Sequence, residues 1–133
     1  MFRRQLLSFF CLLFIVQSPL QAAGFDEAYN AYNSGDYRVA YKGFKQLAQD
    51  GHVKAQYLLG LLYLNGQGVG KNLDKGIDWL KQAAGNGSYL AAAELGQIYA
   101  SGKGVAMDTE EAAKWIELSS LLANDEDADV ECD

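Results

Sequence analysis

Three glycines in the stretch NGQGVGK, residues 65–71, have the backbone freedom that phosphate-binding loops require. A phosphate-binding loop of that kind needs Gly, four residues, Gly-Lys and then Ser or Thr, but Lys71 is followed by Asn72. A dinucleotide-binding loop follows a strand, whereas the residues before Asn65 have helical spacing. The same glycines return at Gly102 and Gly104, which indicates an architectural loop. We therefore expect no nucleotide site and no cofactor.

Metal-binding and catalytic side chains are too few to form a recognisable site. The chain has one histidine, His52, and two distant cysteines, so a structural zinc site is not expected. A Ser-His-Asp triad would have to use His52, and no nucleophile elbow is present. The carboxylates fall mostly at expected solvent-facing or helix-capping positions: Asp74, Asp78, Glu110 and Glu117. The sequence thus predicts no catalytic, cofactor-binding or metal-binding residues and no enzyme, with a small secreted hydrolase as an alternative.

The charge balance limits the class of partner. The 133 residues contain 11 basic and 17 acidic side chains, a formal net charge of −6. A length of this order suits one domain. The acidic balance argues against nucleic acid, whose phosphates need a basic face, and against electrostatic binding to anionic lipid. A protein or peptide partner remains.

Residues 1–23 have the pattern of a secretory signal peptide. Arg3 and Arg4 precede an apolar run over residues 6–16, Pro19 follows, and cleavage is expected after Ala22 or Ala23. The run is about half of the roughly 20 residues that span a bilayer, so an uncleaved membrane anchor is the less favoured alternative.

Export would leave a periplasmic or secreted protein with no stable membrane insertion, and we expect the periplasm of a Gram-negative bacterium. Loss of two arginines would change the formal charge from −6 to −8. Cys132 would be the one remaining cysteine, which excludes an internal disulfide. It either links two copies or is an incidental thiol.

The strongest pattern in the chain is a repeat with a period of 36 residues. Its first copy carries Ala55, Leu59, Gly60, Tyr63, Gly66, Gly68, Val69 and Trp79, and its second carries Ala91, Leu95, Gly96, Tyr99, Gly102, Gly104, Val105 and Trp115. Periods of this size are typical of stacked helical repeats. Each unit is a helix pair with an apolar face that its neighbours must cover.

The repeat resembles the Sel-one-like repeat, a branch of the tetratricopeptide-like helical hairpins, whose pattern is AxxxLGxxYxxGxGVxx(N/D)xxx(A/G)xxW. The resemblance covers residues 52–123 well and residues 25–51 more weakly. It implies an all-α superhelix, a solenoid of about three hairpins. It also implies a scaffold or adaptor that holds other proteins.

The expected units are an abbreviated hairpin over 24–51, two repeats over 52–87 and 88–123, and an acidic, disordered tail over 124–133. The tail is either a solubilising cap or a tether for a basic partner.

Several single residues should define the ends and contacts of these helices. Asn72, Ser88 and Asp108 are expected to cap helices, and Gly51 to end one in the left-handed conformation. Gly60 should let its partner helix approach closely. Gly76 stands where the resembled family usually has Ala. It should either loosen its helix or admit a bulky neighbour.

In tetratricopeptide-like arrays the first helix of each hairpin lines a concave groove, which implies a partner-binding set here. The residues are Phe25, Tyr29, Tyr32, Asn33, Lys54, Tyr57, Leu61, Leu64, Leu90, Ala93 and Gln97. This strip is aromatic and apolar, as partner sites often are. The alternative is that about half of these side chains pack between helices. Tyr29 and Tyr57 are the preferred groove residues.

The predicted function is an exported adaptor that binds a partner protein or peptide in this groove. Within the family's repertoire it would be a regulator, an assembly scaffold or an immunity-type inhibitor. A purely structural envelope subunit without a partner site is the second alternative.

Overall fold

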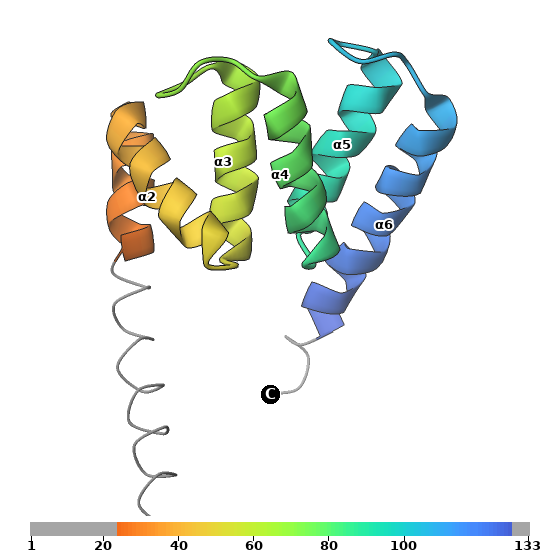
Figure 1. Cartoon of the computed structure of the whole chain (residues 1–133). Coiled ribbons are helices and arrows are strands. Elements are labelled where there is room, and N and C mark those ends of the chain that lie inside the picture. The colour runs from red at the N-terminus through yellow and green to blue at the C-terminus, as the bar shows by residue number, and fades with distance from the viewer. Residues whose placement is uncertain (1–23, 129–133) are drawn as a thin grey trace, which may run out of the picture.

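The computed structural model describes residues 24–128, which are helical apart from short turns and loops. A first helix covers residues 24–33, and five more follow: α2 (Tyr37–Gln49), α3 (Val53–Asn65), α4 (Leu73–Gly85), α5 (Tyr89–Ser101) and α6 (Thr109–Ala128). No strand occurs among these residues. From α2 onward, the main contacts join each helix to the next along the chain. The all-α solenoid of three hairpins is therefore confirmed (Figure 1).

Every helix from α2 onward has an N-terminal cap, a side chain just before the helix that accepts an N–H of its first turn. The predicted caps are confirmed, with bonds of 3.0 Å from Lys75 N to Asn72 Oδ1, 3.2 Å from Ala91 N to Ser88 Oγ, and 2.9 Å from Glu111 N to Asp108 Oδ1. Asp36 caps α2, and the imidazole of His52 caps α3. The cap at His52 was not predicted.

Two glycines let α3 and α4 approach closely. A Cβ on Gly60 would lie 3.0 Å from Leu80 Cδ2 and 3.1 Å from the backbone oxygen of Gly76. This confirms the predicted close approach. A Cβ on Gly76 would lie 2.6 Å from Leu64 Cδ2. Of the two expectations for Gly76, admission of a bulky neighbour is therefore the correct one, and the neighbour is Leu64.

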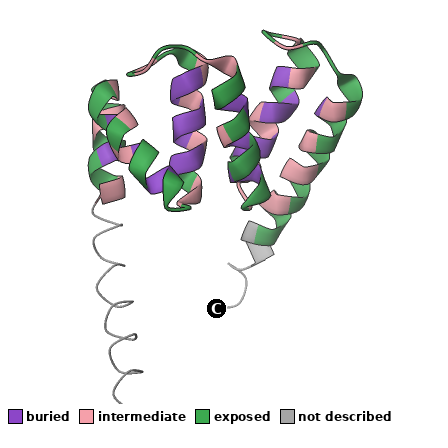
Figure 2. Ribbon diagram, viewed as in Figure 1, coloured by how far each residue is buried: buried purple, intermediate pink, exposed green. Residues whose placement is uncertain are grey.

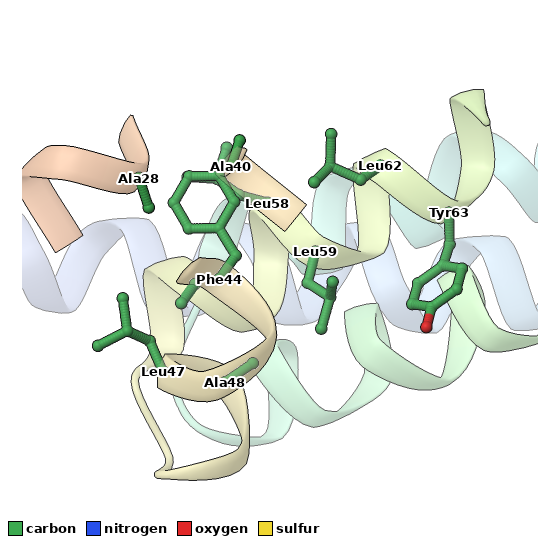
Figure 3. Packing of buried hydrophobic residues seen from close by; sticks show 10 residues of the cluster. Ala28, Ala40, Phe44, Leu47, Ala48, Leu58, Leu59, Leu62 and Tyr63 are labelled. Carbon is green, nitrogen blue, oxygen red and sulfur yellow. The ribbon is translucent and has the colours of Figure 1, made fainter. Parts of the chain in front are cut away.

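Two apolar clusters fill the space between the hairpins (Figure 2). The first cluster comprises Ala28, Ala40, Phe44, Leu47, Ala48, Ala55, Leu58, Leu59, Leu62 and Tyr63 (Figure 3). The second cluster comprises Ile77, Leu80, Ala83, Ala84, Ala91, Ala92, Leu95 and Ile98. Tyr57 packs against both, so the two clusters adjoin at this side chain.

A buried polar side chain also connects the hairpins. Gln56 donates its Nε2 to Ala48 O at 3.2 Å, and its Oε1 accepts Asn86 Nδ2 at 3.0 Å. Ala48 lies in the last turn of α2 and Asn86 directly follows α4, so one side chain of α3 links the ends of α2 and α4. Its pairing satisfies the requirement that a buried amide keep its hydrogen bonds.

The structure describes part of the predicted C-terminal tail and none of the predicted signal peptide. The sequence predicted a disordered tail from Asn124. In the structure, α6 continues to Ala128, so residues 124–128 are helical. Extending an existing helix costs far less than starting one, which explains the difference. The predicted signal peptide at 1–23, the rest of the tail and Cys132 lie outside the described residues. None of the described helices combines the length and hydropathy needed to cross a membrane.

Candidate functional site: a hollow shared by three hairpins

A hollow of about 350 Å³ lies where the first helices of all three hairpins meet. Helix 24–33 contributes Phe25 and Tyr29, and α5 contributes Leu90. The lining from α3 is Lys54, Tyr57 and Leu58. We call this the tyrosine hollow. Its walls are largely aromatic and aliphatic, with one lysine among them.

Stacked rings hold Phe25 in place at the edge of the hollow. Its ring lies 5.7 Å from that of Tyr29 at an interplanar angle of 13°, and 4.6 Å from that of His52 at 18°. Phe25 also meets Phe44 of the first cluster at 5.9 Å. Tyr29 keeps 42% of its surface exposed. In this wall of the hollow, Phe25 is therefore held by its neighbours, whereas Tyr29 is accessible from outside.

Burial raises the pKa of two tyrosines at or near the hollow. It raises the pKa of Tyr57, and the neighbouring carboxylate of Glu94 raises it further. Burial likewise raises the pKa of Tyr32, with smaller contributions from Tyr37 and Tyr29. A tyrosine hydroxyl with an ordinary pKa is already neutral near pH 7, and a raised pKa keeps it neutral, so both hydroxyls can donate or accept a hydrogen bond.

Lys54 lies where three recesses adjoin. A recess of about 450 Å³ is lined by Phe25, Asp26, His52, Val53 and Lys54. Another of about 430 Å³ is lined by Val53, Lys54, Asn86, Gly87, Ser88, Tyr89 and Leu90. Lys54 is exposed, and among the described residues it makes no salt bridge. The depression thus continues past the tyrosine hollow along the starts of α3 and α5.

Five of the eleven predicted groove residues line the tyrosine hollow, namely Phe25, Tyr29, Lys54, Tyr57 and Leu90. Six do not: Tyr32, Asn33, Leu61, Leu64, Ala93 and Gln97. Tyr32 and Leu61 are half-buried against the first cluster, and Leu64 packs against the second. Asn33 and Gln97 are exposed, and Ala93 is half-buried.

Sequence reasoning missed several lining residues because it considered one stripe on each first helix. Leu58 belongs to the first cluster yet reaches the hollow beside Tyr57. Val53, Asn86 and Tyr89 lie at helix starts and turns. The 36-residue spacing of Val53 and Tyr89 is the one signal in the sequence that could have placed these two side chains together.

The only histidine has a structural role in this arrangement. His52 Nδ1 accepts the N–H of Ala55 at 3.2 Å, and its ring stacks on Phe25. Burial lowers the pKa of His52; a backbone hydrogen bond opposes this shift in part, and the charge of Lys54 adds to it. Within residues 24–128, no three His, Cys, Asp or Glu side chains group closely enough to hold a metal ion.

Two solved structures similar to this chain show how it relates to known proteins. A Sel1 repeat protein from Oxalobacter formigenes superposes with a TM-score of 0.70 at 29% identity, over 83% of this chain and 48% of that one. A protective antigen of uropathogenic Escherichia coli strains, which displays an SLR fold, gives 0.68 at 34% identity, over 75% of this chain and 22% of that one. The chain thus spans about half of the first protein and about a fifth of the second.

The family pattern locates the repeats directly. Among curated proteins, no significant match is found. The Sel1 repeat, in contrast, matches residues 53–88 and again residues 90–124, which together exceed half of the chain. Both matches begin within two residues of the boundaries expected from the internal period. The chain therefore belongs to the Sel1-repeat family, whose members generally mediate protein–protein interactions.

Proposed function

We propose that this protein is an exported adaptor that binds a partner protein or peptide in the tyrosine hollow and the recesses beside it. The observation that carries the proposal is that one hollow joins aromatic and apolar side chains from three hairpins. Exposed apolar surface of this kind is typical of partner sites, and tyrosine is enriched among the residues that dominate binding energy. No bond is made or broken in this function.

The recognition would use a peptide or helix seated in a groove. Tyr29 and Tyr57 would act as anchors, because each presents a flat ring with a neutral hydroxyl. Leu90 would supply an apolar contact from the third hairpin. Lys54 would add a positive charge at the edge, and such charges contribute more to orientation and association rate than to affinity.

The cellular setting of this proposal rests on the sequence of residues 1–23. Their pattern of two arginines, an apolar run and small residues favours export to the periplasm of a Gram-negative bacterium or secretion. Plausible roles there are a regulator, an assembly scaffold or an immunity-type inhibitor. In each role the adaptor holds its partner in the hollow.

Simultaneous replacement of Tyr29 and Tyr57 by alanine tests the proposal. We expect the affinity for partners captured from an envelope extract to fall by more than about 2 kcal/mol, since both anchors are lost. Circular dichroism should show that the helices remain. Binding is then measured by calorimetry with the captured partner.

Met107→Ala is the matched control for this experiment. Met107 is 67% exposed in the loop before α6, away from the lining of the hollow. Its loss should leave binding unchanged. If the double tyrosine variant binds as tightly as the Met107 variant, the hollow is not the partner site, and a purely structural subunit becomes the better explanation.

A further inference from the structure

A row of ring contacts connects His52 to the tyrosine hollow. Phe25 stacks on His52 and also on Tyr29. Phe25 and Tyr29 both line the hollow, whereas His52 lies in the adjoining recess, which Phe25 lines as well. A movement of His52 therefore reaches the hollow through a single side chain.

The same imidazole also fixes the start of α3. Its Nδ1 accepts the N–H of Ala55 at 3.2 Å, and α3 supplies Tyr57 and Leu58 to the hollow. The turn before α3 and the start of helix 24–33 lie at the same end of the hairpins (Figure 1). His52 thus holds two of the elements that line the hollow, one by a hydrogen bond and one by its ring face.

The second repeat shows that capping at this position does not need a histidine. Ser88, 36 residues after His52, caps α5 by accepting the N–H of Ala91 at the same distance of 3.2 Å. A serine hydroxyl keeps its acceptor at any ordinary pH, whereas imidazole loses its acceptor when it is protonated. His52 therefore adds two properties that Ser88 lacks, namely a stacking ring and a cap that titrates.

The charged groups around His52 act in opposite directions. Asp26 and Lys54 line its recess, so the carboxylate attracts a charged imidazole and the ammonium group repels it. Glu27 and Asp50 line a separate hollow that shares no residue with this recess. Burial lowers the pKa of His52, a backbone hydrogen bond opposes this shift in part, and Lys54 adds to it. The observed arrangement therefore favours the neutral ring.

We propose that His52 is a pH-dependent switch that sets the shape of the tyrosine hollow. Neutral His52 caps α3 and supports Phe25, which gives the hollow described above. Protonated His52 cannot accept the N–H of Ala55, because both ring nitrogens are then donors. The charged ring turns toward the carboxylate of Asp26. Phe25 moves with it, since a cation keeps its attraction for an aromatic face.

The direction of the effect on binding follows from linkage and rests on the proposed function. A partner in the hollow and the adjoining recess buries His52 further, and burial disfavours the charged ring. Binding is then strongest above about pH 6.5, where free His52 is neutral, and weakens as the pH falls below that value. The change in the hollow itself needs no partner.

Nuclear magnetic resonance between about pH 7.5 and about pH 5.5 tests the switch in protein purified after expression of the full-length chain. The ring signals of His52 give its titration midpoint. We expect the Ala55 amide and the Tyr29 ring to shift with that same midpoint, below about pH 6.5. The Ala91 amide, which Ser88 caps, is the internal reference and should shift much less.

Two variants separate the titration from the cap. His52→Ser copies the cap of the second repeat, so the Ala55 and Tyr29 signals should become independent of pH in this range. Asp26→Asn removes the carboxylate toward which the charged ring turns, so the titration midpoint of His52 should fall. Asp26 is exposed, and its replacement should leave the fold intact.

A captured partner should bind the wild type at least about threefold more weakly at the lower pH, which corresponds to about half a pKa unit. It should bind His52→Ser equally at both pH values. The switch is refuted if the Tyr29 ring stays unmoved while His52 titrates, or if it shifts equally in His52→Ser. An unchanged midpoint in Asp26→Asn would refute the role of Asp26. A hollow that responds to pH but captures no partner would support the switch and reject the proposed function alone.

Discussion

His52 holds two helices together through two separate contacts of one ring. Its Nδ1 caps α3 by accepting the N–H of Ala55, and its face stacks on Phe25 of helix 24–33. The cap requires an unprotonated Nδ1, because both ring nitrogens become donors when imidazole is charged. Protonation therefore removes the cap at the edge of the tyrosine hollow.

The stability of the protein should fall as the pH falls through the titration range of His52. Burial lowers its folded-state pKa below the unfolded value of about 6.5. The folded state thus prefers neutral His52, and its contribution is complete above about pH 6.5 and declines below it. Urea denaturation at about pH 7.5 and about pH 5.5 measures the difference, above the range where most carboxylates titrate.

His52→Asn is the control for this pH effect. Asparagine is a strong helix cap that does not titrate, so α3 should still begin at the same place. The variant should lose less stability than the wild type between the two pH values. An equal loss in both proteins would mean that another group is responsible.

At the scale of single elements, the glycine loops pack closely against the preceding hairpin. A Cβ on Gly68 would collide with the backbone oxygen of Tyr37, the first residue of α2. A Cβ on Gly104 would lie 2.5 Å from Leu73 Cδ2, on the first residue of α4. Each loop therefore rests on the start of the second helix in the preceding hairpin. The pattern that imitates a phosphate loop serves this packing.

Gly68→Ala should destabilise the protein by about 2–5 kcal/mol. The estimate adds about 1–2 kcal/mol for a non-glycine residue at a φ of +71° to about 1–3 kcal/mol for overpacking against backbone. Gly104→Ala should cost about 1–2 kcal/mol, because the side chain of Leu73 can move aside while the φ strain remains. Urea denaturation of both variants measures the free energies of unfolding.

Gly70→Ala is the neutral reference in the same loop. Its Cβ would have no neighbour within 4 Å, and its φ is not in the left-handed region. We expect a change within about 0.5 kcal/mol. If Gly68 and Gly70 tolerate alanine equally well, the loop does not rest on α2 as described.

At the scale of the whole molecule, the features that depend on spacing along the chain could be predicted from the sequence. The 36-residue period identifies the hairpins, because identical letters in fixed register must fold alike. The caps at Asn72, Ser88 and Asp108 were predictable, since each bond reaches only three residues along the chain. The role of Gly60 follows from its place within an apolar helix.

The composition of the tyrosine hollow was only partly predictable. Tyr57 and Leu64 lie on the same helix, yet Tyr57 lines the hollow while Leu64 turns toward Gly76. The direction of each side chain depends on how neighbouring hairpins cross, which spacing along one helix does not determine. The cap at His52 was missed for a different reason, because histidine is not among the usual capping residues.

The contacts of the molecule run from neighbour to neighbour, so damage should stay close to where it is made. Leu95 is completely buried in the second cluster, and Leu95→Ala should cost about 2–5 kcal/mol. In a stack whose units contact only adjacent units, stability is a sum of local terms. Hydrogen exchange should therefore lose more protection in α5 and α6 than in α2.

An equivalent substitution in the first cluster should reverse this pattern of lost hydrogen-exchange protection. Phe44 is also completely buried, and Phe44→Ala should expose the amides of α2 and α3 more than those of α6. Tyr57 packs against both clusters, so part of the stability lost in one cluster should be felt in the other. If both substitutions lower protection equally in all helices, the three hairpins unfold as one unit. The coupling through Tyr57 and Gln56 would then exceed the stability of any single hairpin.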